Sequence, residues 1–434
     1  MSNKLAFLAP GRDEREHFLT ERMAAVTERS MKYRERDLPL YLGVRFLSEA
    51  AAMAQSVAIG WTVYRLSNTP LALGVVGIVQ FVPMFLLTLP AGELCDRVSS
   101  RKVLIAGLIL QGLCALAFLA LAIVPTPVLW PFYVVLLAFG SARAFADPAG
   151  QALLPLLVPA GRLPRAIAWG SSAWQVAVIA GPALGGLVYG FGPAAAYGIC
   201  CAGFFVAALG VAMLAGRETA PAASATLKDR IARVTEGVAF VWSEPIVLGA
   251  ISLDLFAVLL GGATALLPVY AHDILHVGPT GLGLLRSAPA VGACLIALMQ
   301  ARYPSDRHVG LKLFAAIAVF GVATLIFAFS TSFILSVVAL VVLGASDMVS
   351  VNIRSSLLHL ATPDAMRGRV SAVNMLFIGA SGELGAFESG VMAALLGSVP
   401  AVALGGIGTL AIAAIWMVAF PALRRADRLV PAKS

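Results

Sequence analysis

Charged side chains are scarce in this sequence: only 12% of its 434 residues are Asp, Glu, Lys or Arg. An average soluble domain has about 25%, so this chain lacks the polar residues that a water-facing surface requires. Hydrophobic residues make up 59% of the chain, and they gather in runs near the ~20 residues that cross the hydrocarbon core of a bilayer. The composition therefore predicts an all-α protein that crosses a membrane several times.

Cysteine and histidine are also rare, with five of each in the chain. His272 and His276 are one helical turn apart, but beyond Asp273 no third ligand is evident, so we expect no metal site and no bound cofactor. The cysteines lie in or beside apolar runs without metal-ligand spacing, which is typical of small buried residues rather than disulfides; they are Cys95, Cys114, Cys200, Cys201 and Cys294.

Several functional motifs are missing. The sequence has no Gly-x-x-x-x-Gly-Lys-[Ser/Thr] phosphate loop and no recognisable Ser-His-Asp set, so neither ATP hydrolysis nor another enzyme activity is expected. The first 39 residues are charged and have no apolar core or cleavage site, which argues against a signal peptide. The net charge of +8 has a topological cause, and we expect no nucleic-acid partner.

Lysine and arginine fix the predicted orientation. With both termini in the cytoplasm, four basic residues lie within spans (Arg45, Arg143, Arg286 and Arg354), and only Arg65 lies in an outer loop. This bias towards inner loops is typical of a multi-pass protein of the bacterial cytoplasmic membrane. Twelve transmembrane helices are predicted, near 40–64, 71–94, 102–124, 128–155, 165–190, 193–215, 246–271, 280–301, 309–330, 332–357, 370–396 and 398–421.

The longest internal loop divides these spans into two sets of six. Within it, Leu227, Ile231, Val234 and Val238 recur at helical spacing, which predicts an amphipathic helix on the inner membrane surface. The predicted organisation is a cytoplasmic extension (1–39), an N-terminal six-helix bundle (40–215), a cytoplasmic linker (216–245), a C-terminal six-helix bundle (246–421) and a cytoplasmic tail (422–434).

Weak internal similarity supports two related halves. The stretch "NTPLALG" (68–74) resembles "VGPTGLG" (277–283), and "ALLPLLVPAGRLPRA" (152–166) matches "SLLHLATPDAMRGRV" (356–370). These matches follow the same order along the chain, as in transporters built from parallel six-helix repeats. The sequence therefore predicts two pseudo-symmetric six-helix bundles.

The repeat aligns buried charges of opposite sign. Arg45 falls on Asp254, and Arg143 falls on Asp347. A charge at the bilayer centre costs about 2.5–3.5 kcal/mol on insertion scales, so it usually faces a partner or water. We favour the interpretation that a basic half faces an acidic half across a central cavity.

A second interpretation pairs each base on its own helix. Arg45 and Glu49 are four residues apart, as are Arg143 and Asp147, and such pairs lie on one helix face. Glu383 lies near the middle of its span and has no base close in sequence. The acids considered for proton coupling are Glu49, Asp254, Asp347 and Glu383.

The loop "GELCDRVSSRK" (92–102) resembles a motif of the major facilitator superfamily, Gly-x-x-x-Asp-Arg-x-Gly-Arg-Arg/Lys. In that family the Asp-Arg pair joins the inner helix ends and takes part in the switch between inward and outward states. The resemblance therefore implies an inner gate. The residues that fit are Gly92, Asp96, Arg97, Arg101 and Lys102, whereas Ser99 and Ser100 depart from the motif.

The segment "AVIAGPALGGLVYG" (177–190) resembles the Gly-Pro-x-x-Gly-Gly motif associated with antiporters that export their substrates. Gly181, Pro182, Gly185 and Gly186 match, and Ala177 replaces a usual leading glycine. Glycines four residues apart also allow close helix contact in a membrane. The resemblance implies export, whereas the packing argument alone carries no direction.

Residues 251–293 and 362–374 are similar to the enterobactin-exporter-like branch of this superfamily. The resemblance implies a monomeric protein with the twelve-helix major facilitator fold, which exports a small siderophore-like or drug-like molecule in exchange for protons. The alternatives are a broad multidrug or macrolide efflux pump, and a membrane receptor or scaffold that keeps the fold without transport. We expect a small-molecule substrate, protons and the lipid bilayer as partners.

Overall fold

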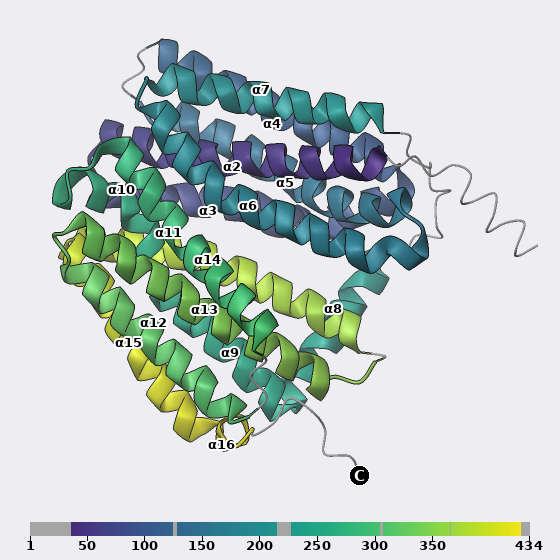
Figure 1. The fold of residues 1–434 in the computed structure, drawn as a ribbon, viewed down its shortest axis with the longest axis vertical. Coiled ribbons are helices and arrows are strands. Elements are labelled where there is room, and N and C mark those ends of the chain that lie inside the picture. The colour runs from purple at the N-terminus through teal and green to yellow at the C-terminus, as the bar shows by residue number, and fades with distance from the viewer. Residues whose placement is uncertain (1–35, 125–127, 215–226, 304–306, 365, 427–434) are drawn as a thin grey trace, which may run out of the picture.

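The computed structural model describes residues 36–124, 128–214, 227–303, 307–364 and 366–426. Most of the predicted N-terminal extension, the first part of the linker and most of the tail lie outside these residues. Every regular element in the described part of the chain is helical. Figure 1 shows two groups of helices that lie side by side.

The first group of helices begins with the long helix α2 and ends with α7. Prolines at the first helical turn suit the start of several of these helices, since the missing N–H has no partner there. The elements are α2 (Asp37–Ser67), α3 (Pro70–Arg97), α4 (Ser100–Ile123), α5 (Trp130–Leu157), η1 (Ala160–Arg162), α6 (Leu163–Tyr189) and α7 (Pro193–Met213).

The second group follows the connecting helix α8 (Leu227–Ser243). Its elements are α9 (Pro245–Leu260), η2 (Ala263–Leu266), α10 (Leu267–Val269), η3 (Tyr270–Ile274), α11 (Gly278–Arg302), α12 (Val309–Phe329), α13 (Phe333–Ala361), α14 (Arg367–Leu396), α15 (Ser398–Ala419) and α16 (Pro421–Arg424).

Helices are present at all twelve predicted spans, but only ten helical segments in the described residues are long and apolar enough to cross a membrane. The other two are α2 and α5, with 31 and 28 residues. Charged side chains such as Glu49 and Arg143 make these two helices less apolar. They are also the helices that carry the candidate charges of the first group.

The predicted span 246–271 lies within an apolar segment long enough to cross a membrane, Pro245–Ile274, but this segment is not one continuous helix. Helix α9 ends at Leu260, and a 3₁₀ turn, a short α-turn and a π-helical turn follow. Glycine at 261 and 262 explains the break. A Cβ on Gly262 would lie 2.7 Å from the carbonyl oxygen of Gly385, so this glycine lets the chain approach the backbone of α14.

The linker forms the expected helix over 227–243, and this helix packs against protein as well. A Cβ on Gly237 would lie 2.9 Å from the carbonyl oxygen of Arg369, so α8 closely approaches the start of α14. The Arg369 guanidinium also pairs with Glu236 at 2.7 Å. Helix α8 is therefore attached to the second group.

The two groups meet closely at one end of the molecule, which we call the closed end. Helix α2 ends there and α11 begins there. A buried apolar cluster crosses between the groups at this end and includes Phe118 and Tyr197 from the first group, and Tyr270 and Phe327 from the second. In Figure 1 this end lies on the left, where the loops around α10 approach the first group.

Candidate functional site

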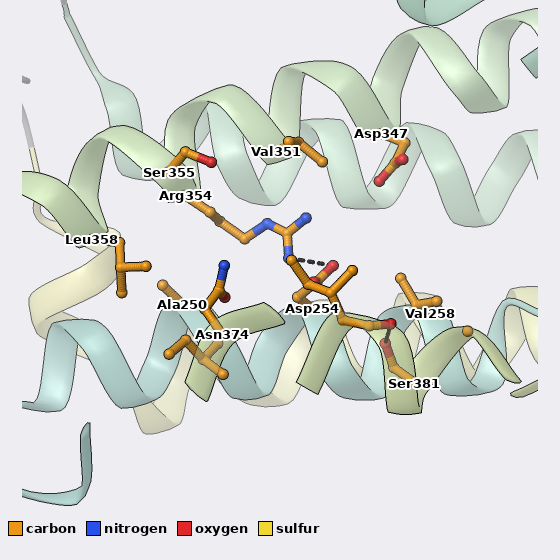
Figure 2. A pocket seen from close by; sticks show the side chains of 13 residues that line it. Ala250, Asp254, Val258, Asp347, Val351, Arg354, Ser355, Leu358, Asn374 and Ser381 are labelled. Atoms are coloured by element: carbon orange, nitrogen blue, oxygen red, sulfur yellow. Dashed lines mark hydrogen bonds and ion pairs between the residues drawn. The ribbon is translucent and has the colours of Figure 1, made fainter. Parts of the chain in front are cut away.

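A cavity of about 350 Å³ lies within the second group, between α9, α13 and α14. Figure 2 shows its side chains, with Asp254 on α9 facing Asp347 and Arg354 on α13. The remaining walls are largely apolar. The lining residues are Ala250, Ile251, Asp254, Val258, Asp347, Val351, Arg354, Ser355, Leu358, Asn374, Ile378, Ser381 and Gly382.

The charge of Arg354 is neutralised within this cavity. Its guanidinium forms an ion pair with the Asp254 carboxylate, and both side chains are about nine-tenths buried, with 11% and 9% exposure. Arg354 Nε also donates a hydrogen bond of 3.3 Å to the carbonyl oxygen of Ser350. Buried charges of this kind are tolerated because each has a partner. Sequence analysis had placed Arg354 inside a span without assigning its partner.

Asp347 points into the same space, as Figure 2 shows. Within the described residues, no ion pair or hydrogen bond to its side chain is found. It also borders a smaller pocket of about 10 Å³ against Ala316 and Phe320 of α12. The cavity thus contains one neutralised carboxylate and one carboxylate without a protein partner.

The first group contains a charged cluster with little free space. Arg45, Glu49, Arg143 and Asp147 border a cavity of about 30 Å³. Glu49 accepts a hydrogen bond from the side chain of Trp174 and interacts electrostatically with both arginines. A space of this size is far below that of ordinary ligand pockets, about 300–1,000 Å³.

The structure does not have the predicted pairing of Arg143 with Asp347 across the halves. Arg143 Nη2 lies 3.5 Å from Asp147 Oδ2 on its own helix, as in the alternative interpretation. Asp254 pairs with Arg354 inside the second group rather than with Arg45. Pairing over one helical turn brings the two charges together without any dependence on how the halves sit.

Glu383 on α14 is the acid that links the two groups electrostatically. It interacts with Arg143 of the first group and Arg286 of the second. Its carboxylate lies at the junction of α3 and α14, because a Cβ on Gly77 would lie 3.3 Å from Glu383 Oε2. Arg286 was recognised in the sequence only as a basic residue inside a span, since nothing nearby in the sequence indicates this contact.

The residues of the expected inner gate lie at the other end of α3 and the start of α4. Arg97 pairs with Glu93 one turn earlier on α3. Arg101 donates hydrogen bonds to the carbonyl oxygens of Val211 and Ala212 at the end of α7. Gly92 and Asp96 belong to α3 and Lys102 to α4, while the side chain of Asp96 lies outside the described part.

The Gly-Pro-x-x-Gly-Gly segment packs in two directions. A Cβ on Gly181 would lie 2.6 Å from Met53 Cβ, and one on Gly185 would lie 2.5 Å from Ala54 Cα, so both glycines face α2. Gly186 faces the other group.

On that second side, a Cβ on Gly186 would lie 2.9 Å from Gly283 Cα on α11 and would meet the carbonyl oxygen of Pro279. The carbonyl oxygen of Pro182 lies close to Gly283 in turn. The segment therefore joins α6 both to its own group and to the opposite one.

A further polar contact across the groups was missed by sequence analysis. Tyr64 at the end of α2 donates a hydrogen bond to Asp273, and His272 Nδ1 lies 2.5 Å from the other oxygen of that carboxylate. The His272 ring also packs against Trp61. Within the described residues, no group of three or more His, Cys, Asp or Glu side chains could hold a metal ion.

Comparison with known proteins identifies the family. The model of the Major Facilitator Superfamily matches residues 41–386. The multidrug efflux pump Tap of Mycolicibacterium fortuitum is 28% identical over 351 residues, which cover 77% of this chain and 83% of the pump. The enterobactin exporter EntS of Shigella boydii serotype 18 is 26% identical over 341 residues, covering 76% of this chain and 78% of the exporter.

Solved transporter structures share the fold. A peptide transporter POT variant has a TM-score of 0.74 at 13% identity and covers 93% of this chain and 99% of its own. A bacterial homologue of the human lysosomal transporter Spinster, in an inward-facing and unoccupied conformation, has a TM-score of 0.67 at 14% identity and covers 92% and 99%.

Proposed function

Because this chain belongs to the major facilitator superfamily, and is therefore a multi-pass inner-membrane transporter rather than an enzyme, we propose that it exports a small organic molecule by proton antiport. The predicted bundles 40–215 and 246–421 would move relative to each other by alternating access. Its relatives include both an efflux pump and a siderophore exporter, so a siderophore-like or drug-like substrate is the proposed class.

The observation that carries the antiport proposal is the electrostatic interaction of Glu383 with Arg143 of the first group and Arg286 of the second. Protonation of Glu383 removes the charge that attracts an arginine of the opposite group. The attraction between the groups then depends on proton binding, and a ligand shifts a conformational equilibrium only through such differential interactions. Glu49, which shares Arg143 with Glu383, is the second group proposed to take part.

The proposed direction is outward. The positive-inside bias favours cytoplasmic termini, which would put the closed end outside and the loop between α3 and α4 inside. In this orientation the hydrogen bonds of Arg101 to the end of α7 support an inner gate formed by Gly92, Asp96, Arg97, Arg101 and Lys102. The export motif Gly181, Pro182, Gly185 and Gly186 would hold the outer contact.

Everted membrane vesicles that contain the protein test energy coupling, with ethidium and enterobactin as probes. Vesicles that are acidified inside should accumulate a substrate, and an uncoupler should abolish accumulation. The variant Glu383→Gln should keep exchange down a substrate gradient but lose accumulation driven by protons. Glu388→Gln, on the same helix, is the matched control and should accumulate like the parent protein.

Accumulation that needs ATP and persists without a proton gradient would refute antiport. Full accumulation by Glu383→Gln would refute the role of that carboxylate.

A broad-specificity multidrug or macrolide pump is the second candidate function. The largely apolar walls of the cavity between α9, α13 and α14 support it, as does the relative named as a multidrug efflux pump. Transport of several unrelated probes, each competing with the others, distinguishes this function from export of one substrate. A receptor or scaffold without transport is the weaker alternative, because such a protein has little use for buried charges.

A further inference from the structure

We propose that the cavity between α9, α13 and α14 selects substrates that carry a cationic group, with Asp347 as the residue that binds this group. The inference rests on the proposed function, since it names the substrate class of that site. Of the two proposed substrate classes, this inference favours a cationic drug-like molecule over an anionic siderophore-like one.

The charges that face the cavity leave one carboxylate in excess. Helix α9 contributes Asp254, and α13 contributes Arg354 and Asp347. The cavity-lining residues of α14 are uncharged, including Asn374 and Ser381. Since Arg354 pairs with Asp254, a bound ligand meets the carboxylate of Asp347 as the remaining charge.

A further carboxylate, Glu383, lies next to this cavity. Glu383 follows the lining residue Gly382 on α14, but its carboxylate interacts with Arg143 and Arg286. Glu383 is not among the residues that line the cavity, and Arg143 in turn forms an ion pair with Asp147. The excess at Asp347 persists when the surrounding elements are included.

The volumes of the two cavities also favour a ligand site in the second group. The cavity of about 350 Å³ at Asp347 is large enough for part of a drug-sized molecule, whereas the cavity in the charged cluster of the first group is about 30 Å³. Apolar walls around Ile251, Val351 and Ile378 suit the apolar body of an amphiphilic cation. An anion would lie beside an unpaired carboxylate of the same sign, which disfavours binding.

The test measures equilibrium binding to the purified full-length protein. Ethidium is the fluorescent probe, and 4-phenylbutylamine and 4-phenylbutyrate are competitors that share an apolar body but end in opposite charges. The parent protein should bind ethidium and be displaced by the amine at concentrations at least about tenfold lower than by the carboxylate. This difference is expected because one charge-assisted hydrogen bond changes the binding affinity by about 10- to 100-fold.

Asp347→Asn should weaken ethidium binding by about 10- to 100-fold and remove the preference for the amine. Asp347→Glu keeps the charge and should keep the preference, which shows that a loss in Asp347→Asn is not a folding defect. Asp364→Asn removes an exposed carboxylate outside the cavity, paired with Arg367, and should bind like the parent protein.

Equal displacement by the two competitors in the parent protein would overturn the proposal. So would a preference that survives in Asp347→Asn, or an absence of any binding of ethidium and the amine. The proposed function fails separately, because it requires accumulation driven by protons. Charge-selective binding without proton-driven accumulation would support this inference and refute antiport. Proton-driven accumulation by a protein that prefers anions would support antiport and refute this inference.

Discussion

The substitution Gly186→Ala tests the contact by which the two groups close at one end. A methyl group on Gly186 would meet the carbonyl oxygen of Pro279 and lie 2.9 Å from Gly283 Cα, and neither backbone atom can rotate away. Since α6 and α11 belong to different groups, this overlap exists only while the groups touch there. The better helix propensity of alanine, up to about 1 kcal/mol, is gained in both states and cancels.

The size of the effect follows from overpacking, which typically costs about 1–3 kcal/mol. Because this cost arises only in the state in which the two groups touch, it shifts the equilibrium from the closed towards the open end by about 5- to 150-fold. Spin labels at residues 191 and 334 report this shift, because double electron–electron resonance measures the distance between them. Phe191 and Ile334 are 82% and 75% exposed, on opposite groups, so labels there should not disturb packing. The distance distribution should move to longer values.

Two glycines of the same helix provide the controls. At Gly170 the nearest atom to an added Cβ is Leu154 Cδ2 at 3.7 Å, so Gly170→Ala should leave the distances unchanged. Gly185→Ala creates an overlap with Ala54 inside one group, in both states. It should lower thermal stability without moving the distances. If Gly186→Ala and Gly170→Ala give the same distribution, the glycine contact does not govern closure.

Three further variants test other contacts. Gly185→Leu should insert into the membrane but lose transport, because its side chain would separate α6 from α2; near-normal uptake in vesicles would contradict this. Tyr64→Phe removes a hydrogen bond to Asp273, worth about 1.5–3 kcal/mol when one partner is charged, and should lengthen the same spin-label distances. Arg354→Ala leaves Asp254 buried without its partner, so thermal unfolding should show a loss of about 3–5 kcal/mol. An unchanged melting temperature would refute that account of the pair.

Helix positions could be predicted because membrane spans depend on local composition. Runs of apolar residues give the helices of both groups, and proline after a turn marks several of their starts. The break in the helix within 246–271 has a local cause that hydropathy does not register. Gly261 and Gly262 are as compatible with an apolar run as alanine is, and the reason for the break lies in the approach of α14 near Gly385.

The charge pairs show what the sequence could not settle. The internal repeat aligns Arg143 with Asp347, but alignment between halves does not imply contact. The pairing of Arg143 with Asp147 follows from helical spacing. The sequence offers this pairing as one of two interpretations but does not decide between them. The pairing of Arg354 with Asp254 joins residues 100 positions apart, and only the packing of α13 against α9 brings them together.

The inversion of charge between the halves acquires a physical meaning when the two cavities are compared. In the first group, bases and acids satisfy one another around a space too small for a ligand. At the position that the sequence repeat aligns with Arg143, Asp347 faces a larger space without a partner. Glu383 lines neither cavity and is attracted to an arginine of each group. Under the proposed antiport, proton binding at Glu383 and ligand binding at Asp347 therefore use different carboxylates, and changing one should alter coupling while changing the other alters selectivity.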